Sequence, residues 1–205
     1  MTQQFLVATH NPGKVAEFAT MLADLRLTWL GLGDVGITLD VPETGTTFYE
    51  NAILKARGYA AASRLITLAD DSGLEVDALN GRPGIHTGRY GGEGLTHAQR
   101  YQRLLSELLG VPWAERTARF RCVIVVARPD GALLGSTEGI CEGIIAEAPA
   151  GNGGFGYDPV FYLPERGQTL AELAAAVKNQ VSHRGQALRK IEPLLRQLVD
   201  HQTND

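Results

Sequence analysis

Two β-rich segments in the middle of the chain constrain the fold most. Residues 118–128 and 133–145 are separated by Pro129, Asp130 and Gly131, and turn-forming residues between two such runs indicate a β-hairpin. A hairpin pairs its two strands antiparallel, so a sheet that contains this one is not wholly parallel.

The first half of the chain alternates between strand and helix patterns. A short apolar run at 5–8 precedes a segment at 15–25 with apolar residues at helical spacing. Thr47 can cap a second helix, with Glu50 reaching back to the first turn, and an apolar run at 65–69 follows that helix.

Three further helices are predicted at 96–109, 169–176 and 182–199. Pro193 should kink or interrupt the last of them, because proline removes a helical hydrogen bond. Strands and helices that alternate early, with a hairpin late, favour an α/β fold with a mixed sheet.

Length and composition match one soluble domain. With 205 residues, 44% of them apolar, the chain can bury a core without disulfides or a structural metal. We expect a single domain over residues 1–205, with room for two lobes. The apolar runs are too short for a membrane-spanning helix and the first residues lack a signal-peptide pattern, so we expect a cytoplasmic protein. Cys122 and Cys141 form no C-x-x-C pair, which favours buried, reduced thiols.

Net charge and glycine content limit the classes of function that the chain can have. A net charge of −4 argues against a nucleic-acid partner, because binding to a phosphate backbone needs a basic face. Glycine makes up 24 of the 205 residues, and ten of those lie within 81–94 and 151–156. Glycine gathered in this way indicates loops that bend sharply or approach a ligand closely.

The turn after the first predicted strand has the outline of a phosphate site. Thr9 to Lys14 reads Thr-His-Asn-Pro-Gly-Lys, and a helix N-terminus beside a lysine attracts anions. It is not a Walker A loop, because the glycine expected five residues before Gly13 is missing and Val15 replaces the magnesium-binding hydroxyl. An ordinary strand-to-helix turn with a solvated lysine explains the same residues.

Three carboxylates, those of Glu43, Asp70 and Asp71, form a second candidate site. The two aspartates directly follow the run at 65–69, and we expect the strand to end there. Neighbouring strand residues point to opposite faces, so only one aspartate should enter a ligand crevice. Oxygen ligands suit magnesium, whereas a turn capped by an aspartate side chain needs no metal, and both interpretations stay open.

The loop at 151–159 carries aromatic side chains among glycines. Phe155 and Tyr157 can stack on a planar ligand such as a nucleobase, or they can cover the core. Asp158 can accept a hydrogen bond from a base amine or from a neighbouring backbone amide.

The segment before the last predicted helix concentrates cations. Ser182 is a suitable N-cap, which places His183 and Arg184 in the first helical turn, where the helix dipole disfavours positive charge. A phosphate or a base edge would offset that charge, although solvated charges at a helix start cost little. For His183 alone, a structural role is the simpler interpretation.

Taken in order, these segments resemble the pyrophosphatases of noncanonical purine nucleoside triphosphates, the inosine and xanthosine triphosphate housekeeping enzymes. The resemblance runs from about Phe5 to Leu198. It rests on residues 9–14, 43–56, 70–79, 82–90, 154–161 and 178–184.

The resemblance implies a two-lobed α/β fold, in which helices flank a long, mixed, twisted sheet and the substrate enters a central cleft. It implies hydrolysis of ITP, dITP and XTP to the monophosphate and pyrophosphate, which keeps deaminated purines out of DNA and RNA. Mg²⁺ is the implied cofactor and a homodimer the implied assembly.

The resemblance also implies roles for matching residues. Asp71 is the implied catalytic base and, with Glu43, an implied magnesium ligand, and Ser72 contacts the substrate beside them. The implied triphosphate site consists of Thr9, His10 (through its backbone), Asn11, Pro12, Gly13, Lys14 and Lys55. The implied base pocket consists of Phe155, Gly156, Tyr157, Asp158, Lys178, His183 and Arg184.

One segment departs from the family pattern. Ile85, His86, Thr87, Gly88 and Arg89 stand where an aromatic-Ser-Ala-Arg run is usual. Thr87 keeps a hydroxyl and Gly88 loosens the backbone, so we expect the shape or mobility of this loop to differ. Two alternatives stay open, namely a pyrophosphatase for modified pyrimidine or methylated nucleotides and a nucleotide-binding regulatory module without hydrolysis.

Overall fold

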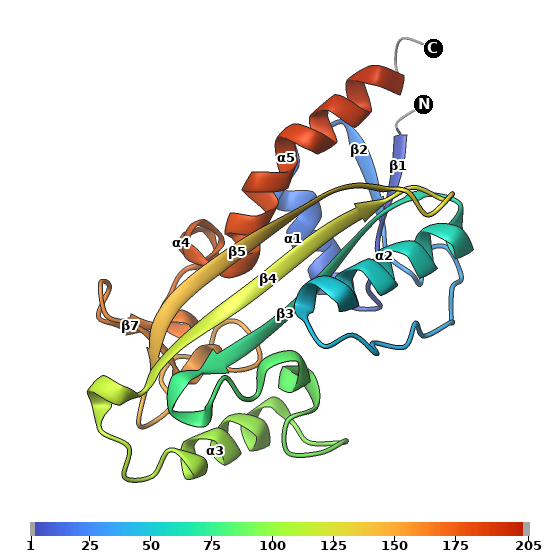
Figure 1. The fold of residues 1–205 in the computed structure, drawn as a ribbon. Helices are drawn as coiled ribbons and strands as arrows, with labels where there is room; N and C mark the ends of the chain where they lie inside the picture. The colour runs from blue at the N-terminus through green and yellow to red at the C-terminus, as the bar shows by residue number, and fades with distance from the viewer. Residues whose placement is uncertain (1–2, 203–205) are drawn as a thin grey trace. The chain divides into compact units, whose positions relative to one another are not determined.

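The computed structural model describes residues 3–202, and the strands in that range form one seven-stranded sheet in the order β2-β1-β3-β4-β5-β6-β7 (Figure 1). The strands are β1 (Gln3–Val7), β2 (Leu27–Leu30), β3 (Ile66–Val76), β4 (Thr117–Ala127), β5 (Leu133–Ile145), β6 (Phe161–Leu163) and β7 (Gln168–Thr169). Strand β1 pairs parallel with β2 and β3, whereas β6 pairs antiparallel with β5 and β7. The predicted α/β fold with a mixed sheet is confirmed.

Five α-helices occur between residues 3 and 202, and short 3₁₀ helices connect other elements. The α-helices are α1 (Pro12–Met21), α2 (Phe48–Ser63), α3 (His97–Glu107), α4 (Ala175–Val181) and α5 (His183–Gln202). The 3₁₀ helices are η1 (Asp77–Leu79), η2 (Gly84–Arg89), η3 (Trp113–Glu115), η4 (Asp158–Val160) and η5 (Leu170–Glu172). In this part of the chain, no helix combines the length and the apolar character that a membrane span requires.

The chain divides into two compact units. Unit 1 comprises residues up to 71, residues 122–139 and residues from 185 onward, and unit 2 comprises residues 72–121 and 140–184. Strands β3, β4 and β5 contribute residues to both units.

Unit 1 has apolar side chains on both faces of its strands. The core on one face consists of Phe5, Val7, Phe18, Leu22, Leu25, Ile66, Leu68, Cys122, Ile124, Val126, Ala187, Leu188, Ile191 and Leu195. These residues alternate along β1, β3 and β4 with others that are also buried, such as Leu6 and Thr67. Because successive strand residues face opposite sides, the second face is also covered. Helix α2 buries the small residues Ala52, Ala56 and Ala60, and small side chains let a helix pack closely on its neighbours.

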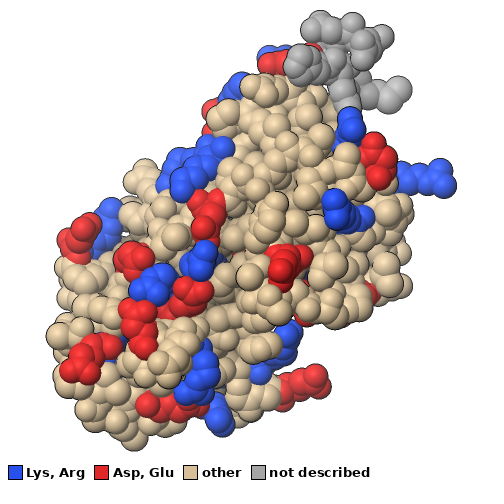
Figure 2. Space-filling model, in the orientation of Figure 1, with Lys and Arg blue, Asp and Glu red and all other residues tan. Residues whose placement is uncertain are grey.

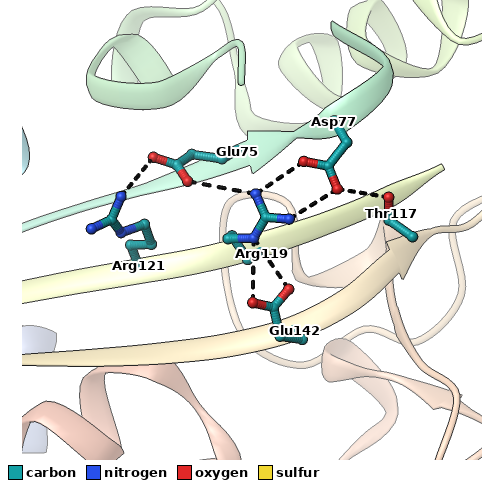
Figure 3. A network of polar contacts seen from close by, with 6 residues as sticks. All are labelled: Glu75, Asp77, Thr117, Arg119, Arg121 and Glu142. Carbon is teal, nitrogen blue, oxygen red and sulfur yellow. Dashed lines mark hydrogen bonds and ion pairs between the residues drawn. The ribbon is translucent and has the colours of Figure 1, made fainter. Parts of the chain in front are cut away.

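Unit 2 combines an apolar core with a charged sheet face. In β4, Ala118 and Phe120 are buried, and the residues that alternate with them belong to a charged network (Figure 3). The network consists of Glu75, Asp77, Thr117, Arg119, Arg121 and Glu142. Figure 2 shows acidic and basic side chains interspersed on the face in view.

Arg119 is the centre of the charged network. Its guanidinium donates to both oxygens of Asp77 at 3.0 and 2.9 Å and to the Glu142 carboxylate at 3.2 Å. These hydrogen bonds lower the pKa of the Asp77 carboxyl. Arg121 donates to Glu75 at 3.3 Å.

Three sequence predictions need correction. Strand β3 continues through the two aspartates to Val76 rather than ending at Asp70. Of the kink or interruption predicted at Pro193, the interruption is wrong: helix α5 is continuous there, because apolar residues on either side of the proline pack into the unit 1 core. The helix predicted at 169–176 is replaced by η5, closed by a capping box between Thr169 and Glu172, and by the separate helix α4.

Other predicted elements are confirmed. The hairpin of β4 and β5 turns at Gly131, whose φ of +84° suits glycine. Thr47 caps α2 by accepting a hydrogen bond from the Glu50 amide at 3.1 Å, and the Glu50 carboxylate accepts from the Thr46 amide at 2.7 Å. Helix α1 begins at Pro12, three residues before the predicted start, because Asn11 is its N-cap.

Candidate active site

The turn from β1 into α1 is held by its own polar groups. The Asn11 side chain accepts a hydrogen bond from the Gly13 amide at 2.9 Å, and the Thr9 hydroxyl accepts from the Asn11 amide at 3.1 Å. The Lys14 amide donates to the Asn11 carbonyl at 3.1 Å. These amides are therefore used within the turn, and the Lys14 ammonium is the strongest attraction that this turn offers an anion.

Two lysines and three carboxylates of unit 1 form a cluster around the end of this turn. Lys14 Nζ donates to both oxygens of Asp70, at 3.1 and 3.2 Å. Lys55 Nζ, from α2, pairs with Asp71 Oδ1 at 2.8 Å and with Glu43 Oε1 at 2.9 Å. We call Lys14, Glu43, Lys55, Asp70 and Asp71 the carboxylate–lysine cluster. Asp70 and Asp71 have different lysine partners, as expected for neighbouring strand residues that point to opposite faces.

The cluster holds three carboxylates and two ammonium groups. This excess of negative charge shifts the pKa values of Asp71 and Lys55, which form its shortest ion pair. Burial raises the pKa of Asp71, and attraction to Lys55 lowers it by less. Repulsion from Glu43 adds to the rise. Burial alone would lower the pKa of Lys55, but attraction to Asp71, Asp70 and Glu43 outweighs burial and raises it. Asp71 is therefore a carboxylate with a raised affinity for a proton, which suits a general base.

Asp71 also has the features of a cation ligand. Its side chain is buried, at 8% exposure for the residue, and its Oδ2 has no hydrogen-bond partner among the described residues. Glu43 is joined to Asp71 through their shared ion pair with Lys55. Within residues 3–202 no set of three or more metal-ligating side chains converges. Two carboxylates nevertheless suit magnesium, which takes one or two from the protein and completes its shell with water and phosphate oxygens. The residues present fit Mg²⁺.

Ser72 follows Asp71 in β3 and is half-buried. It is the first residue of unit 2. The residues predicted for the base pocket also belong to unit 2.

The loop at 154–158, which we call the base loop, is built around Asp158. The Asp158 Oδ2 atom accepts hydrogen bonds from the Phe155 amide at 2.7 Å and from Lys178 Nζ at 2.6 Å. Of the two roles left open for Asp158, the one observed is acceptance from a neighbouring amide. Gly154 has φ of +70°, and a Cβ there would lie 2.1 Å from Asp158 Oδ2. A side chain at 154 is therefore excluded by its own loop.

The two aromatic side chains of the base loop have different surroundings. Tyr157 is buried, and its hydroxyl donates to the Thr87 carbonyl at 3.1 Å, so it covers the core. Phe155 is 47% exposed. Lys178 Nζ lies 4.9 Å and Arg184 Cζ 5.5 Å from the centre of its ring. An exposed ring next to two cations can stack on a planar, electron-rich ligand.

His183 and Arg184 lie in the first turn of α5, as predicted, and both are buried rather than solvated. The His183 ring stacks on Phe120, with ring centres 4.7 Å apart and planes at 13°. This contact supports the structural role inferred for His183 from the sequence.

Several contacts that shape the site were not predicted. Thr87 Oγ1, in the segment that departs from the family pattern, accepts from the Leu74 amide at 2.8 Å and donates to the Gly84 carbonyl at 2.6 Å. His97 accepts a hydrogen bond from the base loop. The Lys14–Asp70 ion pair joins residues 56 positions apart. The Thr87 hydroxyl could be recognised in the sequence. The Lys14–Asp70 ion pair and the contact of His97 join residues far apart in the chain, so no local sequence pattern predicts them.

Comparison with known proteins identifies the family. A model of the Ham1 family matches residues 5–194. The chain belongs to the Ham1 family. This Ham1 chain is 51% identical over 197 residues to the dITP/XTP pyrophosphatase of Geobacillus kaustophilus, covering 96% of each chain. It is 46% identical over 193 residues to the dITP/XTP pyrophosphatase of Bacillus subtilis, covering 94% of this chain and 97% of the relative.

Solved structures agree with the family assignment. A HAM1 protein from Coxiella burnetii has a TM-score of 0.88 and 41% identity, covering 96% of this chain and all of that one. The Ham1 protein of Staphylococcus aureus has a TM-score of 0.86 and 39% identity, with the same coverage. The resemblance drawn from the sequence is therefore confirmed at the level of family and fold.

Proposed function

We propose that the chain is a hydrolase that converts dITP, XTP and ITP to the monophosphate and pyrophosphate. The observation that carries this proposal is the carboxylate–lysine cluster, in which Glu43 and the buried Asp71 share one ammonium, that of Lys55. Relatives with matching length and about half of their residues identical are dITP/XTP pyrophosphatases. The activity would keep deaminated purines out of DNA and RNA.

Residues of unit 1 would bind the phosphates. Lys14 and Lys55 would neutralise the negative charge that grows on the phosphates in the transition state. Thr9, His10, Asn11, Pro12, Gly13 and Lys14 would lie against the triphosphate, with Asn11 keeping the turn in shape and the Lys14 ammonium supplying the positive charge. Ser72 would contact the substrate next to Asp71.

Asp71 would act as the base. Its carboxylate would take a proton from a water molecule as the water oxygen bonds to the α-phosphorus. The bond from that phosphorus to the bridging oxygen would break, and pyrophosphate would leave. Glu43 and Asp71 would hold Mg²⁺, which when bound supplies positive charge to the phosphate oxygens. The buried position of Asp71, with its Oδ1 held by Lys55, supports this role because it fixes the carboxylate in place.

Residues of unit 2 would bind the base. Phe155 would stack on the purine ring, with Gly156, Tyr157 and Asp158 fixing the loop. Lys178, His183 and Arg184 would donate to the 6-oxo edge that hypoxanthine and xanthine share. The 6-amino group of adenine cannot accept these hydrogen bonds, and a buried donor left unpaired costs enough binding energy to reject adenine.

We further propose that the two units act as one pyrophosphatase domain with the central cleft implied by the resemblance, in a cytoplasmic homodimer. Light scattering coupled to gel filtration tests the dimer, because a mass equal to one chain would contradict it.

A pyrophosphate-release assay tests the function. We expect release from dITP, XTP and ITP to be much faster than release from dATP, and to stop when a chelator removes divalent metal. Asp71→Asn should lower the rate constant by about 100-fold or more, which is the usual contribution of a general base. Preferred hydrolysis of a modified pyrimidine or methylated nucleotide would replace the proposed substrate. Tight binding of inosine nucleotides without release of product would indicate a regulatory module.

A further inference from the structure

A histidine outside the predicted site contacts the base loop. The Gly156 amide donates a hydrogen bond to His97 Nδ1 at 2.6 Å. The His97 ring also lies edge-on to Phe155, with ring centres 6.5 Å apart and planes at 80°. His97 thus contacts two consecutive residues of the loop, 59 positions away from Gly156 along the chain.

The backbone of His97 is fixed by the start of helix α3. Thr96 is the N-cap, and its hydroxyl accepts from the Gln99 amide at 3.2 Å while the Gln99 side chain accepts from the Thr96 amide at 2.8 Å. This reciprocal capping box holds the first turn in a defined conformation. His97 is the first residue of that turn, so its imidazole starts from a fixed point in unit 2.

The base loop needs a fixed point of this kind. Gly154 and Gly156 both have positive φ, at +70° and +66°, and glycine has many accessible conformations in the absence of external contacts. Asp158 fixes the Phe155 amide from within the loop, and Tyr157 is fixed at its hydroxyl. The hydrogen bond from the Gly156 amide to His97 fixes the Phe155–Gly156 peptide from outside the loop.

We infer that His97 is a positioning residue for base recognition, which holds the Gly156 amide through Nδ1 and thereby orients the Phe155 ring. This inference rests on the proposed function, because it assigns base binding to the loop. His97 acts through the base loop and leaves the carboxylate–lysine cluster unchanged. Losing it should therefore raise the KM for the nucleotide and leave kcat unchanged.

Three substitutions separate the acceptor from the ring. In His97→Asn, the side-chain oxygen occupies the position of Nδ1 on the γ-carbon, so the acceptor remains and most of the ring is lost. In His97→Phe the ring remains without an acceptor, and His97→Ala removes both. Position 97 is exposed, so all three variants should fold, which thermal melting would confirm.

Steady-state pyrophosphate release from dITP measures the effect. We expect His97→Phe and His97→Ala to raise the KM about five- to tenfold, as for the loss of one hydrogen bond, with kcat within about twofold of wild type. His97→Asn should keep the KM within about twofold. Inorganic tripolyphosphate, which has no base, should inhibit all four proteins with the same inhibition constant.

Each contrary result has its own meaning. If wild-type protein hydrolyses dITP and His97→Ala has an unchanged KM, the positioning role is wrong and the proposed function stands. A KM raised equally in His97→Asn and His97→Ala, or a fall in kcat, also overturns the role of the acceptor. If wild-type protein releases no pyrophosphate from any nucleotide, the proposed function fails and this inference fails with it.

Discussion

Replacing Lys55 by methionine tests whether the carboxylate–lysine cluster is held together by charge. Lys55 is 12% exposed and pairs with Asp71 at 2.8 Å and Glu43 at 2.9 Å. Removing one partner of a buried ion pair costs about 3–5 kcal/mol, because the other charge stays buried and uncompensated. Glu43 is 30% exposed and partly screened by water, so we take the lower end, about 3 kcal/mol.

This loss of stability should be visible as a shift in melting temperature. For a chain of this length, 1 kcal/mol corresponds to about 2–4 °C, which gives a decrease of about 6–12 °C for Lys55→Met. Differential scanning calorimetry in metal-free buffer at pH 7 measures it. Arg196→Met is the matched control, since it also replaces a cation by methionine in an ion pair, here an exposed one with Glu192 at 2.7 Å. The control should lose less than about 2 °C.

The pH dependence gives a second measure of the same interaction. The pKa of Asp71 is raised above 3.8 in the folded chain, so the fold binds that proton more tightly than the unfolded chain does. Acidification through the raised pKa neutralises Asp71 and removes the charge that Lys55 compensates. The difference in stability between wild type and Lys55→Met should therefore shrink as the pH falls from 7 toward 4. A melting temperature for Lys55→Met within 2 °C of wild type at pH 7 would refute the reasoning.

Three further predictions concern unit 2. Burial and the hydrogen bond to Glu107 raise the pKa of Tyr90 from 10.0 to about 12. The free energy of unfolding, measured with urea, should therefore fall more steeply between pH 10 and 12 in wild type than in Tyr90→Phe. An equal fall in both proteins would contradict this. Gly154→Ala should raise the KM for dITP at least tenfold, because its Cβ would collide with Asp158; an unchanged KM would show that the loop adapts. Arg116→Met, which removes hydrogen bonds to three buried carbonyls, should cost about 3 kcal/mol in urea unfolding, and a loss below about 1 kcal/mol would contradict the reasoning.

Sequence reasoning succeeded where the controlling interactions are local. The hairpin of β4 and β5 depends on the turn at Gly131, and the start of α2 depends on Thr47 a few residues away. The prediction for the end of β3 was wrong. Two adjacent aspartates are typical of a turn, and the ion pairs with Lys14 and Lys55 that allow them to stay in the strand cannot be inferred from neighbouring residues. Those lysines lie 56 and 16 positions away.

Packing at a distance explains the other differences. Pro193 loses one helical hydrogen bond, but Ile191 and Leu195 on either side are buried, and their packing offsets the loss. The resemblance supplied the identities of the candidate site residues. It could not show that Asn11 and Asp158 hold their own loops together, or that His97 contacts Gly156, because these depend on side-chain geometry.

The charged network of unit 2 has a consequence for how the strands find their partners during folding. Side chains on a strand alternate between faces, so a slip of one residue in β4 would exchange Arg119 and Arg121 with Phe120. Two guanidinium groups would then enter the apolar core while Glu75, Asp77 and Glu142 lost their counterions. A slip of one residue is therefore penalised on both faces of the sheet, and the ion pairs of the charged network favour the alignment in which these charges are paired.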